Sequence, residues 1–323
     1  MKAIIGIDIS KRNFTVALML GSRVRKNEFD NDEYGFKKLR DWLTENGVTK
    51  ARICMEATGS YGERLADFLY YNGYEVSVLN PMCIRSYAKS RLSRHKTDGI
   101  DAILIAEYAS KNYELVLYKP RSSAIHELKA LHRCLQSLKG QYVQAINHLE
   151  NKFVLPQSVI TIWQDIANDI LAKINIAEAT MNELISSDSL IDQDVKNLGS
   201  IPGIGTATAI AIIAETPEIT SFQDARQLAA FIGITPSHKT SGSSVRFKSR
   251  ISKIGSKYLP KALYFPAIVA KRCNPILRDF SEKLKAKGKH NMVILIAVMR
   301  KLVHIIYGIL KHKTPFKPSI ENS

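Results

Sequence analysis

The sequence predicts an α/β domain over residues 1–118, a helical coiled-coil hairpin over residues 119–195 and a mostly helical domain over residues 196–323. Three patterns support this division. Strand-like apolar runs alternate with helical patterns in the first region, which is the layout of a mixed sheet flanked by helices. Apolar residues then recur at alternating spacings of three and four. A Pro-Gly-Ile-Gly turn opens the last region, where helical patterns dominate.

The first domain begins with a short apolar run over residues 3–9, which indicates a buried central strand. Residues 14–20 and 23–29 indicate a hairpin, because Gly21 and Ser22 join them. The remaining predicted elements are, in order, a helix over 31–46, a strand over 51–56, a helix over 61–71, a strand over 74–79 and a helix entered near Thr97.

The middle region predicts two antiparallel helices that pack along an apolar seam, with Pro156 between them. The seam residues are Leu128, Leu131, Leu135, Leu138, Ile146 and Leu149 in the first helix and Trp163, Ile166, Ile170, Ile174, Ala177, Met181 and Leu184 in the second. Such a seam is buried either within one chain or against another subunit, and the pattern leaves both possibilities open.

The last domain opens with the turn from Ile201 to Gly205, followed by an apolar helix over 206–215. Gly203 and Gly205 of this turn are candidate nucleic-acid-binding residues. A glycine-rich turn between helices, as in helix-hairpin-helix elements, presents backbone N–H groups to a phosphate. The alternative is an ordinary tight connection between two helices.

The net charge of +16 is confined to the end of the chain. From Lys239 onward there are 19 basic and three acidic residues, whereas the preceding residues include 27 of each kind. A merely solubilising charge would be spread evenly. An excess confined to one region therefore predicts a polyanionic partner.

Cysteine usage and hydropathy predict a cytoplasmic protein. The four cysteines are widely separated and form no CxxC pair, which argues against a zinc site or a disulfide framework. An aspartate at position 8 comes too early for a signal peptide. The apolar stretch 292–310 has Arg300, Lys301 and His304 near its middle, so we expect a buried helix and no membrane partner.

Four acidic residues are candidate metal ligands. Asp8 lies inside an apolar strand, where a carboxylate is costly unless it is paired or holds a metal. Glu56 ends another strand, and the ends of adjacent strands are where α/β folds place their sites. Asp98 and Asp101 lie three residues apart in a first helical turn, so they share one face. Each acid alone has a structural explanation, but the joint arrangement predicts a site.

Carboxylates that converge from two strands and one helix form an all-oxygen site suited to Mg²⁺ or Mn²⁺. Two such ions about 4 Å apart would stabilise the attacking and leaving oxygens of a phosphodiester. The segment from Gly6 to Ser10 also resembles the start of sugar kinases. Those ATPases need a second glycine-rich phosphate loop and an adenosine motif, which this sequence lacks.

A serine-rich turn precedes a strand with a predicted basic face. Arg246, Lys248 and Arg250 alternate with less polar residues and would share one face, where three cations suit a phosphate. Lys253 and Lys257 extend this nucleic-acid-binding surface.

Ser241 lies in the turn, where it could attack phosphorus if a base or metal activates it. Composition does not distinguish Ser241 from Ser243, Ser244 or Ser249, and an ordinary serine-rich turn is the plainer interpretation.

Over essentially its whole length the chain resembles transposases of the insertion sequence one-ten family, the DEDD transposases or bridge-RNA-guided recombinases. The motifs that carry the resemblance are Gly6-Ile7-Asp8, Met55–Gly59 and Lys96–Ala102, then Ile201–Gly205, Leu228–Gly233 and Ser241–Lys253. Each motif is moderately specific, and all of them in order are very specific. Phe247 departs from the pattern, because a smaller residue is expected there.

The resemblance implies a RuvC-like domain of ribonuclease H fold, with Asp8, Glu56, Asp98 and Asp101 as a Mg²⁺-binding tetrad and Ser241 as the nucleophile. It implies cleavage and rejoining of DNA through a covalent phosphoserine, which conserves the phosphodiester energy and needs no ATP. The implied partners are target and donor DNA and a structured non-coding guide (bridge) RNA. Homodimers would assemble into a tetramer whose active sites combine two subunits.

Two other classes of protein remain open from the residues themselves. One is a metal-dependent nuclease of the Holliday-junction-resolvase type, which would use the tetrad alone and water as the nucleophile. The other is a non-catalytic nucleic-acid-binding protein with structural carboxylates. The family resemblance also implies a bacterial or archaeal cell, with the protein associated with the nucleoid.

Overall fold

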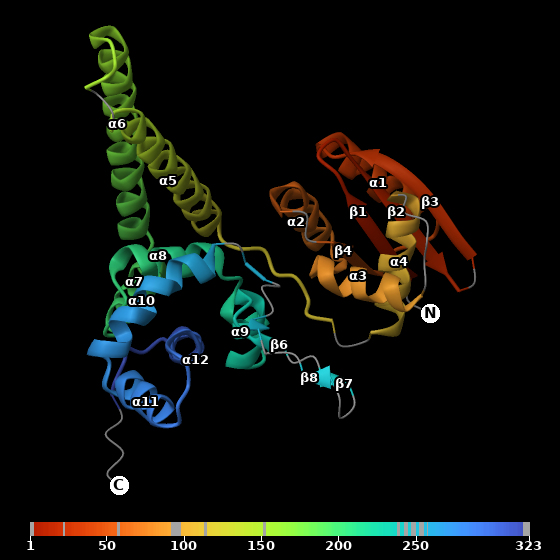
Figure 1. The fold of residues 1–323 in the computed structure, drawn as a ribbon. Coiled ribbons are helices and arrows are strands. Elements are labelled where there is room, and N and C mark those ends of the chain that lie inside the picture. Colours follow the sequence, from red (N-terminus) through yellow and green to blue (C-terminus); the bar gives the residue numbers. More distant parts are fainter. Residues whose placement is uncertain are drawn as a thin grey trace. The chain divides into compact units, whose positions relative to one another are not determined.

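The computed structural model describes residues 3–21, 23–56, 59–91, 98–112, 115–150, 153–237, 240–241, 245–246, 250–251, 255–256 and 258–318. The chain divides into two compact units, Met1–Pro120 and Arg121–Ser323 (Figure 1). The three-domain division stays a prediction. Helix α7 (Ser189–Gly199) runs across the boundary that was expected after residue 195.

The first unit contains the predicted mixed sheet. Its strands are β1 (Ala3–Ile9), β2 (Asn13–Leu20), β3 (Arg23–Asp30), β4 (Ala51–Glu56) and β5 (Glu75–Leu79). They lie in the order β3-β2-β1-β4-β5. The first three strands are antiparallel neighbours, whereas β1, β4 and β5 pair in parallel. The α/β character expected of this region is confirmed.

Helices cover both faces of the sheet. Their bounds are α1 (Glu33–Glu45), α2 (Glu63–Tyr71), α3 (Pro81–Ser90) and α4 (Asp98–Lys111), with a 3₁₀ turn η1 (Gly59–Gly62) before α2. Leu39 of α1 and Leu65 of α2 share an apolar core with Ile7 and Met55. Ile105 of α4 packs in a second core with residues of β4 and β5. Residues at alternate positions along a strand thus pack against helices on opposite faces of the sheet.

The second unit is mostly helical, as expected. Its helices are α5 (Ser123–His148), α6 (Gln157–Ser187), α7, α8 (Thr206–Glu215), α9 (Ala225–Ile232), α10 (Leu259–Cys273), α11 (Pro275–Ala286) and α12 (Asn291–His312), with a 3₁₀ turn η2 (Ile219–Ser221). The residues described between α9 and α10 include the two-residue strands β6 (Pro236–Ser237), β7 (Thr240–Ser241), β8 (Val245–Arg246) and β9 (Arg250–Ile251). One apolar core joins the base of α5 and α6 to the helices that follow.

Among the described residues, α12 is the one helix long and apolar enough to cross a membrane by length and composition. Half of its most apolar window is buried inside the protein. Val298, Leu302 and Ile306 belong to the core of the second unit. The expectation of a buried helix here is confirmed.

The predicted α5–α6 hairpin is present (Figure 1). The His148 and Trp163 rings stack with centroids 3.9 Å apart, and Lys139 Nζ lies 2.7 Å from Glu178 Oε1. The contact partner moves forward along α6, from Trp163 to Glu178, as the position in α5 moves back from His148 to Lys139, which confirms the antiparallel arrangement.

The predicted seam is correct at the base of the hairpin and at Trp163, but it is wrong at Ile146 and Ile166. Ile146 and Ile166 are each 39% exposed, whereas Ala145 and Ala167 are buried. Strict alternation of three and four residues from Leu138 reaches Ala145, not Ile146. The seam is therefore lined by small alanines there, and the larger isoleucines point outward.

Candidate functional site

Asp8 and Glu56 lie at the same edge of the first unit's sheet. The parallel register of β1 and β4 pairs Ile7 with Met55, so the two acids take the next positions on adjacent strands. Ile7 and Met55 are buried in the core beneath α1 and α2. Because side chains alternate along a strand, Asp8 and Glu56 belong to the opposite face, which α4 covers. Both acids are half-buried.

Helix α4 runs antiparallel to β1 and β4. The Arg52 side chain, near the start of β4, lies 3.5 Å from the carbonyl oxygen of Asn112, just after α4 ends. The end of the helix is therefore near the start of β4, and its first turn is toward Glu56. Gly6 permits this packing, since a Cβ there would lie 2.1 Å from the carbonyl oxygen of Ala102.

The first turn of α4 contains the other two predicted ligands. The helix begins at Asp98, whose side chain lies outside the described residues, and Asp101 is half-buried. Among the side chains that are described, no three His, Cys, Asp or Glu gather closely enough to hold a metal ion. The donor chemistry nevertheless fits a hard divalent cation, because two strand ends and one helical turn present carboxylate oxygens on one face of the sheet.

Asn31 is a residue at this edge that sequence patterns did not single out. Its side-chain amide donates to the carbonyl oxygens of Ser10 and Tyr61, each at 3.0 Å. Ser10 follows β1 and Tyr61 follows β4. Asn31 therefore connects the two loops that leave the sheet edge bearing Asp8 and Glu56 (the carboxylate edge). An asparagine next to a predicted helix start was the only local signal, and it suggests a cap rather than a link between loops.

The candidate nucleophile lies at the end of a short ladder in the second unit. Ser241 of β7 pairs with Val245 of β8, and three residues connect them. A second ladder pairs Ser237 of β6 with Arg250 of β9. The side chain of Ser241 and those of the connecting serines lie outside the described residues.

Within the segment 245–250, which the sequence predicts as one strand, the described residues belong to the short strands β8 and β9. Between the ladders, two residues separate the outgoing strands and three separate the returning ones. A one-residue offset changes which side chains share a face. The common basic face of Arg246, Lys248 and Arg250 therefore stays a prediction. Lys248, Lys253 and Lys257 lie outside the described residues, as do the side chains of Arg246 and Arg250.

Both ends of this segment are fixed to the C-terminus of α9. Gly233 ends the helix with a φ of 89°, a left-handed conformation that favours glycine. On the return, the Ser256 N–H donates to the carbonyl oxygen of Phe231 at 2.9 Å. A Cβ at Gly255 would lie 2.3 Å from that same oxygen. The chain from residue 234 to 254 thus leaves from and returns to the end of α9; this excursion, closed at its base, includes Ser241.

The turn from Ile201 to Gly205 joins α7 to α8 and packs on α10. Gly203 has a φ of 104°, and a Cβ there would lie 2.6 Å from the backbone nitrogen of Ala270. Ile201 and Ile204 are buried, whereas Gly205 is exposed at the start of α8. Packing is sufficient to explain glycine at position 203. Nucleic-acid contact by Gly203 and Gly205 stays a prediction.

A buried ion pair ties the base of α5 to the end of α8. The Glu215 side chain is only 3% exposed, and Arg133 donates to it from Nε and Nη2 at 2.9 Å each, with His132 Nδ1 at 3.4 Å. Burial raises the pKa of Glu215, but the hydrogen bonds and charges of His132 and Arg133 outweigh it and lower this pKa to about 2. The Arg133 guanidinium also lies 4.8 Å from the Tyr258 ring centroid, just before α10.

Both units match families of DNA-transposing enzymes. Residues 5–157 match a family model of DEDD type described as a transposase. Residues 195–282 match a model described as the transposase IS116/IS110/IS902 family. The carboxylate edge falls in the first match, and Ser241 with its excursion falls in the second.

Curated relatives extend over the whole chain. The pilin gene-inverting proteins of Moraxella bovis and Moraxella lacunata are each 32% identical over 99% of this chain and 99% of their own. The transposase for insertion sequence element IS1111A of Coxiella burnetii is 24% identical over 74% of this chain and 70% of its own. Among solved structures, YeaZ from Pseudomonas aeruginosa is 18% identical over 28% of this chain and 49% of its own, with a TM-score of 0.21 that supports no argument.

This chain belongs to the IS110 family of transposases. It is therefore an enzyme of the class that cuts and rejoins DNA.

Proposed function

We propose that this protein cuts and rejoins DNA through a covalent phosphoserine at Ser241, with a divalent cation held by Asp8, Glu56, Asp98 and Asp101. The observation that carries the proposal is the carboxylate edge. Two acids take neighbouring positions on parallel strands, on the face covered by the helix whose first turn begins at Asp98. On this proposal the first unit is a RuvC-like domain of ribonuclease H fold, which its mixed strand order supports.

The proposed chemistry conserves bond energy. Ser241 Oγ gives up its proton and attacks the phosphorus, a serine O–P bond forms, the P–O bond to one deoxyribose breaks, and the released oxygen takes up a proton, so that protons balance over the step. A deoxyribose hydroxyl of a second strand reverses the step, so rejoining needs no ATP. Mg²⁺ or Mn²⁺, when bound by the tetrad, would neutralise charge on the reacting phosphate.

Insertion and inversion are two outcomes of the same chemistry. The Moraxella relatives are named for inverting a pilin gene and match this chain end to end at 32% identity. The Coxiella relative is named for an insertion sequence and matches at 24%. We propose insertion-sequence transposition as the main function and site-specific inversion as the second candidate. A substrate with two sites on one DNA molecule distinguishes them by the orientation of the recovered segment.

The proposed partners are target and donor DNA and a structured bridge RNA that pairs with both. Support comes from the charge distribution, because 19 basic residues against three acidic ones from Lys239 onward suit polyanions. The first test is to purify the protein without nuclease treatment and to sequence any copurifying RNA. A single discrete RNA is expected, and heterogeneous RNA would contradict guidance.

The serine step is tested by a denaturant-resistant adduct. Matched DNA is incubated with the protein and Mg²⁺, and a protein–DNA adduct is sought after denaturation. Ser241→Ala is expected to abolish the adduct, whereas Ser243→Ala and Ser244→Ala serve as matched controls and should retain it. Nicking without any adduct would instead favour a resolvase-like nuclease that uses water.

We further propose that the α5–α6 hairpin mediates a homodimer, and that two dimers assemble into a tetramer. The outward faces of these helices expose large apolar residues, including Val143, Ile146, Ile162, Ile166 and Ile176. An apolar stripe of this kind is typical of a protein interface. Ile146→Glu with Ile166→Glu should lower the mass measured by light scattering. Leu190→Glu, at an exposed leucine of α7, is the matched control.

A further inference from the structure

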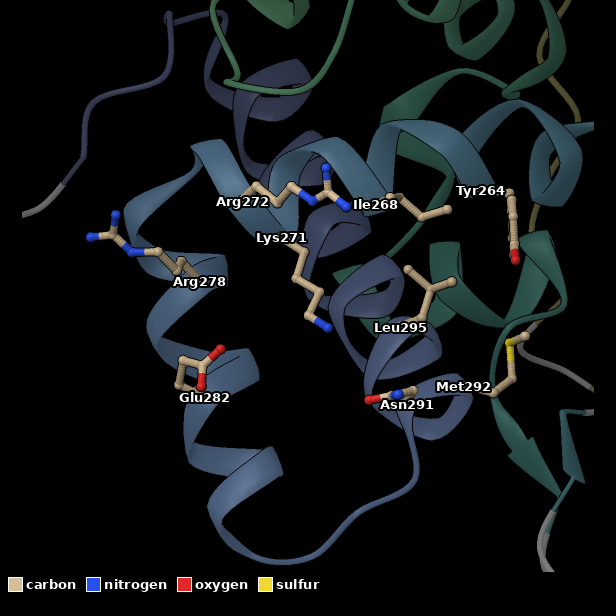
Figure 2. A pocket seen from close by; sticks show the side chains of 9 residues that line it. All are labelled: Tyr264, Ile268, Lys271, Arg272, Arg278, Glu282, Asn291, Met292 and Leu295. Carbon is tan, nitrogen blue, oxygen red and sulfur yellow. The ribbon is translucent and has the colours of Figure 1, made fainter.

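A pocket of about 600 Å³ lies between α10, α11 and α12, in the basic quarter of the chain. Figure 2 shows the side chains that line it. Tyr264, Leu295 and Met292 gather on one side, and Lys271 extends from α10 into the space between α11 and α12 (Figure 2). The pocket therefore combines an aromatic and aliphatic wall with a cation. Its volume suits a nucleotide-sized ligand.

The cations of this pocket differ in whether the protein neutralises them. Arg278 Nε lies 3.8 Å from Asp279 Oδ1. Lys271 and Arg272 have no carboxylate partner among the described residues. The carboxylate of Glu282 also lines the pocket, but its ion pair is with Lys285 and not with either cation. Two adjacent cations that form no ion pair among the described residues favour a ligand that brings its own negative charge.

The apolar wall adds a second requirement to the ligand. A phosphate alone would not use Tyr264 and Met292, whereas an unstacked base has a flat face that packs against aromatic side chains. Bases in a duplex are already stacked on one another, so they do not enter a pocket between helices. The basic excess also continues outside the pocket, for example at Lys283, which favours a polymer over a free nucleotide.

We infer that this pocket binds one unpaired nucleotide of a single-stranded nucleic acid, with its phosphate at Lys271 and Arg272 and its base against Tyr264. Glu282 and Asn291 complete the lining with an acceptor and an amide that can hydrogen-bond a base edge or a sugar hydroxyl. The inference rests on the proposed function in that guide RNA or a DNA strand supplies the nucleotide.

The test measures binding by fluorescence anisotropy with the full chain in EDTA. The probes are labelled 12-mers of single-stranded RNA, of DNA of the same sequence and of DNA without bases, together with a duplex. Lys271→Gln should weaken binding of the RNA and DNA single strands about tenfold. It should also reduce the slope of the logarithm of the binding constant against the logarithm of salt concentration by about one, which corresponds to one lost phosphate contact. Lys261→Gln, an exposed lysine of the same helix outside the pocket, should change binding less than about twofold.

The base is tested separately from the phosphate. Tyr264→Leu should weaken binding of single strands with bases about tenfold and leave the strand without bases unchanged. Phe265→Leu is the matched control, because Phe265 is 72% exposed and lies outside the pocket. If Tyr264→Leu unfolds the protein, Met292→Ala replaces it, since Met292 is half exposed.

Three results would contradict nucleotide binding at this pocket. The first is that Lys271→Gln and Lys261→Gln weaken binding equally, and the second is that Tyr264→Leu weakens binding equally for strands with and without bases. The third is that the duplex competes for binding as strongly as a single strand does. Tighter binding of RNA than DNA identifies the guide as the source, and the reverse order identifies a DNA strand. Because EDTA removes metal chemistry, lost binding would leave the serine mechanism intact. A missing adduct with intact binding would contradict the mechanism alone.

Discussion

The first unit places Asp8 and Glu56 on central strands of a five-stranded sheet, whereas the second places Ser241 on a two-residue ladder in an excursion between α9 and α10. The acids are fixed by strand register and by a helix packed on Gly6. The excursion is fixed at its base, where Gly255 meets the end of α9. On the proposed function, a rigid scaffold suits the residues that would hold the cation, and a segment fixed at its base suits the proposed nucleophile Ser241.

Removal of one strand carboxylate gives the largest expected effect. Asp8→Asn should lower the DNA cleavage rate by about 10³-fold or more, because a lost metal ligand removes several kcal/mol of transition-state stabilisation. Cleavage is measured on matched DNA in Mg²⁺, and circular dichroism checks the fold. Asp41→Asn, at an exposed aspartate of α1, is the control. Full activity of Asp8→Asn would remove the first unit from the chemistry.

Acid should affect the second unit through Glu215. Its pKa is about 2 when folded against an ordinary value of 4.5, so the ionised form stabilises the folded state. This stability is fully present above about pH 4.5 and is lost as the pH falls toward 2. The loss amounts to about 3 kcal/mol.

Urea unfolding measured between pH 7 and pH 3 tests this prediction. Glu215→Gln should lower the free energy of unfolding at pH 7 by about 3 kcal/mol or more, because Arg133 remains without its partner. The variant should also show a flatter pH profile than the natural chain. Identical pH profiles for the two proteins would contradict the prediction.

Two glycine substitutions test the carboxylate edge and the Ser241 excursion independently of each other. Gly6→Ala and Gly255→Ala each place a Cβ within 2.3 Å of a carbonyl oxygen, and each should cost about 1–3 kcal/mol of stability. Gly6→Ala displaces α4 and should weaken Mn²⁺ binding measured by calorimetry. Gly255→Ala opens the base of the excursion and should reduce the serine adduct while leaving Mn²⁺ binding unchanged.

The control for both is Gly140→Ala. Gly140 lies within α5, and nothing lies within 4 Å of a Cβ added there. This variant should keep both metal binding and the adduct, and it should gain stability slightly because alanine favours a helix. If Gly255→Ala also weakened Mn²⁺ binding, the two halves would not be independent.

Asn31 gives the smallest expected effect. Asn31→Ala removes the hydrogen bonds to Ser10 and Tyr61, so the loops beside the carboxylate edge lose their link. We expect a loss of about 1 kcal/mol in stability and about a tenfold slower cleavage. Asn72→Ala removes one hydrogen bond at the end of α2 and should slow cleavage little. Equal cleavage rates in the two variants would exclude a positioning role for Asn31.

Local periodicity was sufficient to predict most of the first unit. Strand β4 has the predicted bounds of 51–56, because an apolar run between turns is a strong signal. Helix α3 was not predicted, although Asn80 caps it and Pro81 is its first residue. These two residues mark the start of a helix, but the prediction relied on the spacing of apolar residues. The carboxylate edge was predictable because burying a carboxylate in an apolar strand costs free energy unless the group is paired or holds a metal.

Contacts between distant residues were not predictable. The close approaches at Gly6, Gly203 and Gly255 depend on which helix packs where, and glycine alone does not identify its neighbour. The seam of α5 was misplaced at Ile146 because large apolar residues were preferred over Ala145. The pairing of β8 with β7 and of β9 with β6 depends on residues before the turn, which alternation within one strand does not reveal.

The closed base of the excursion has a consequence for engineering. Its entrance at Gly233 and its exit at Gly255 both lie at the end of α9, and Ile234, just inside the entrance, belongs to the helical core. A longer or shorter segment beyond Ile234 would therefore leave that core contact in place. Each doubling of such a loop costs only about 0.6 kcal/mol of closure entropy. The segment between Ile234 and Gly255 is therefore suited to exchange as a unit between related chains.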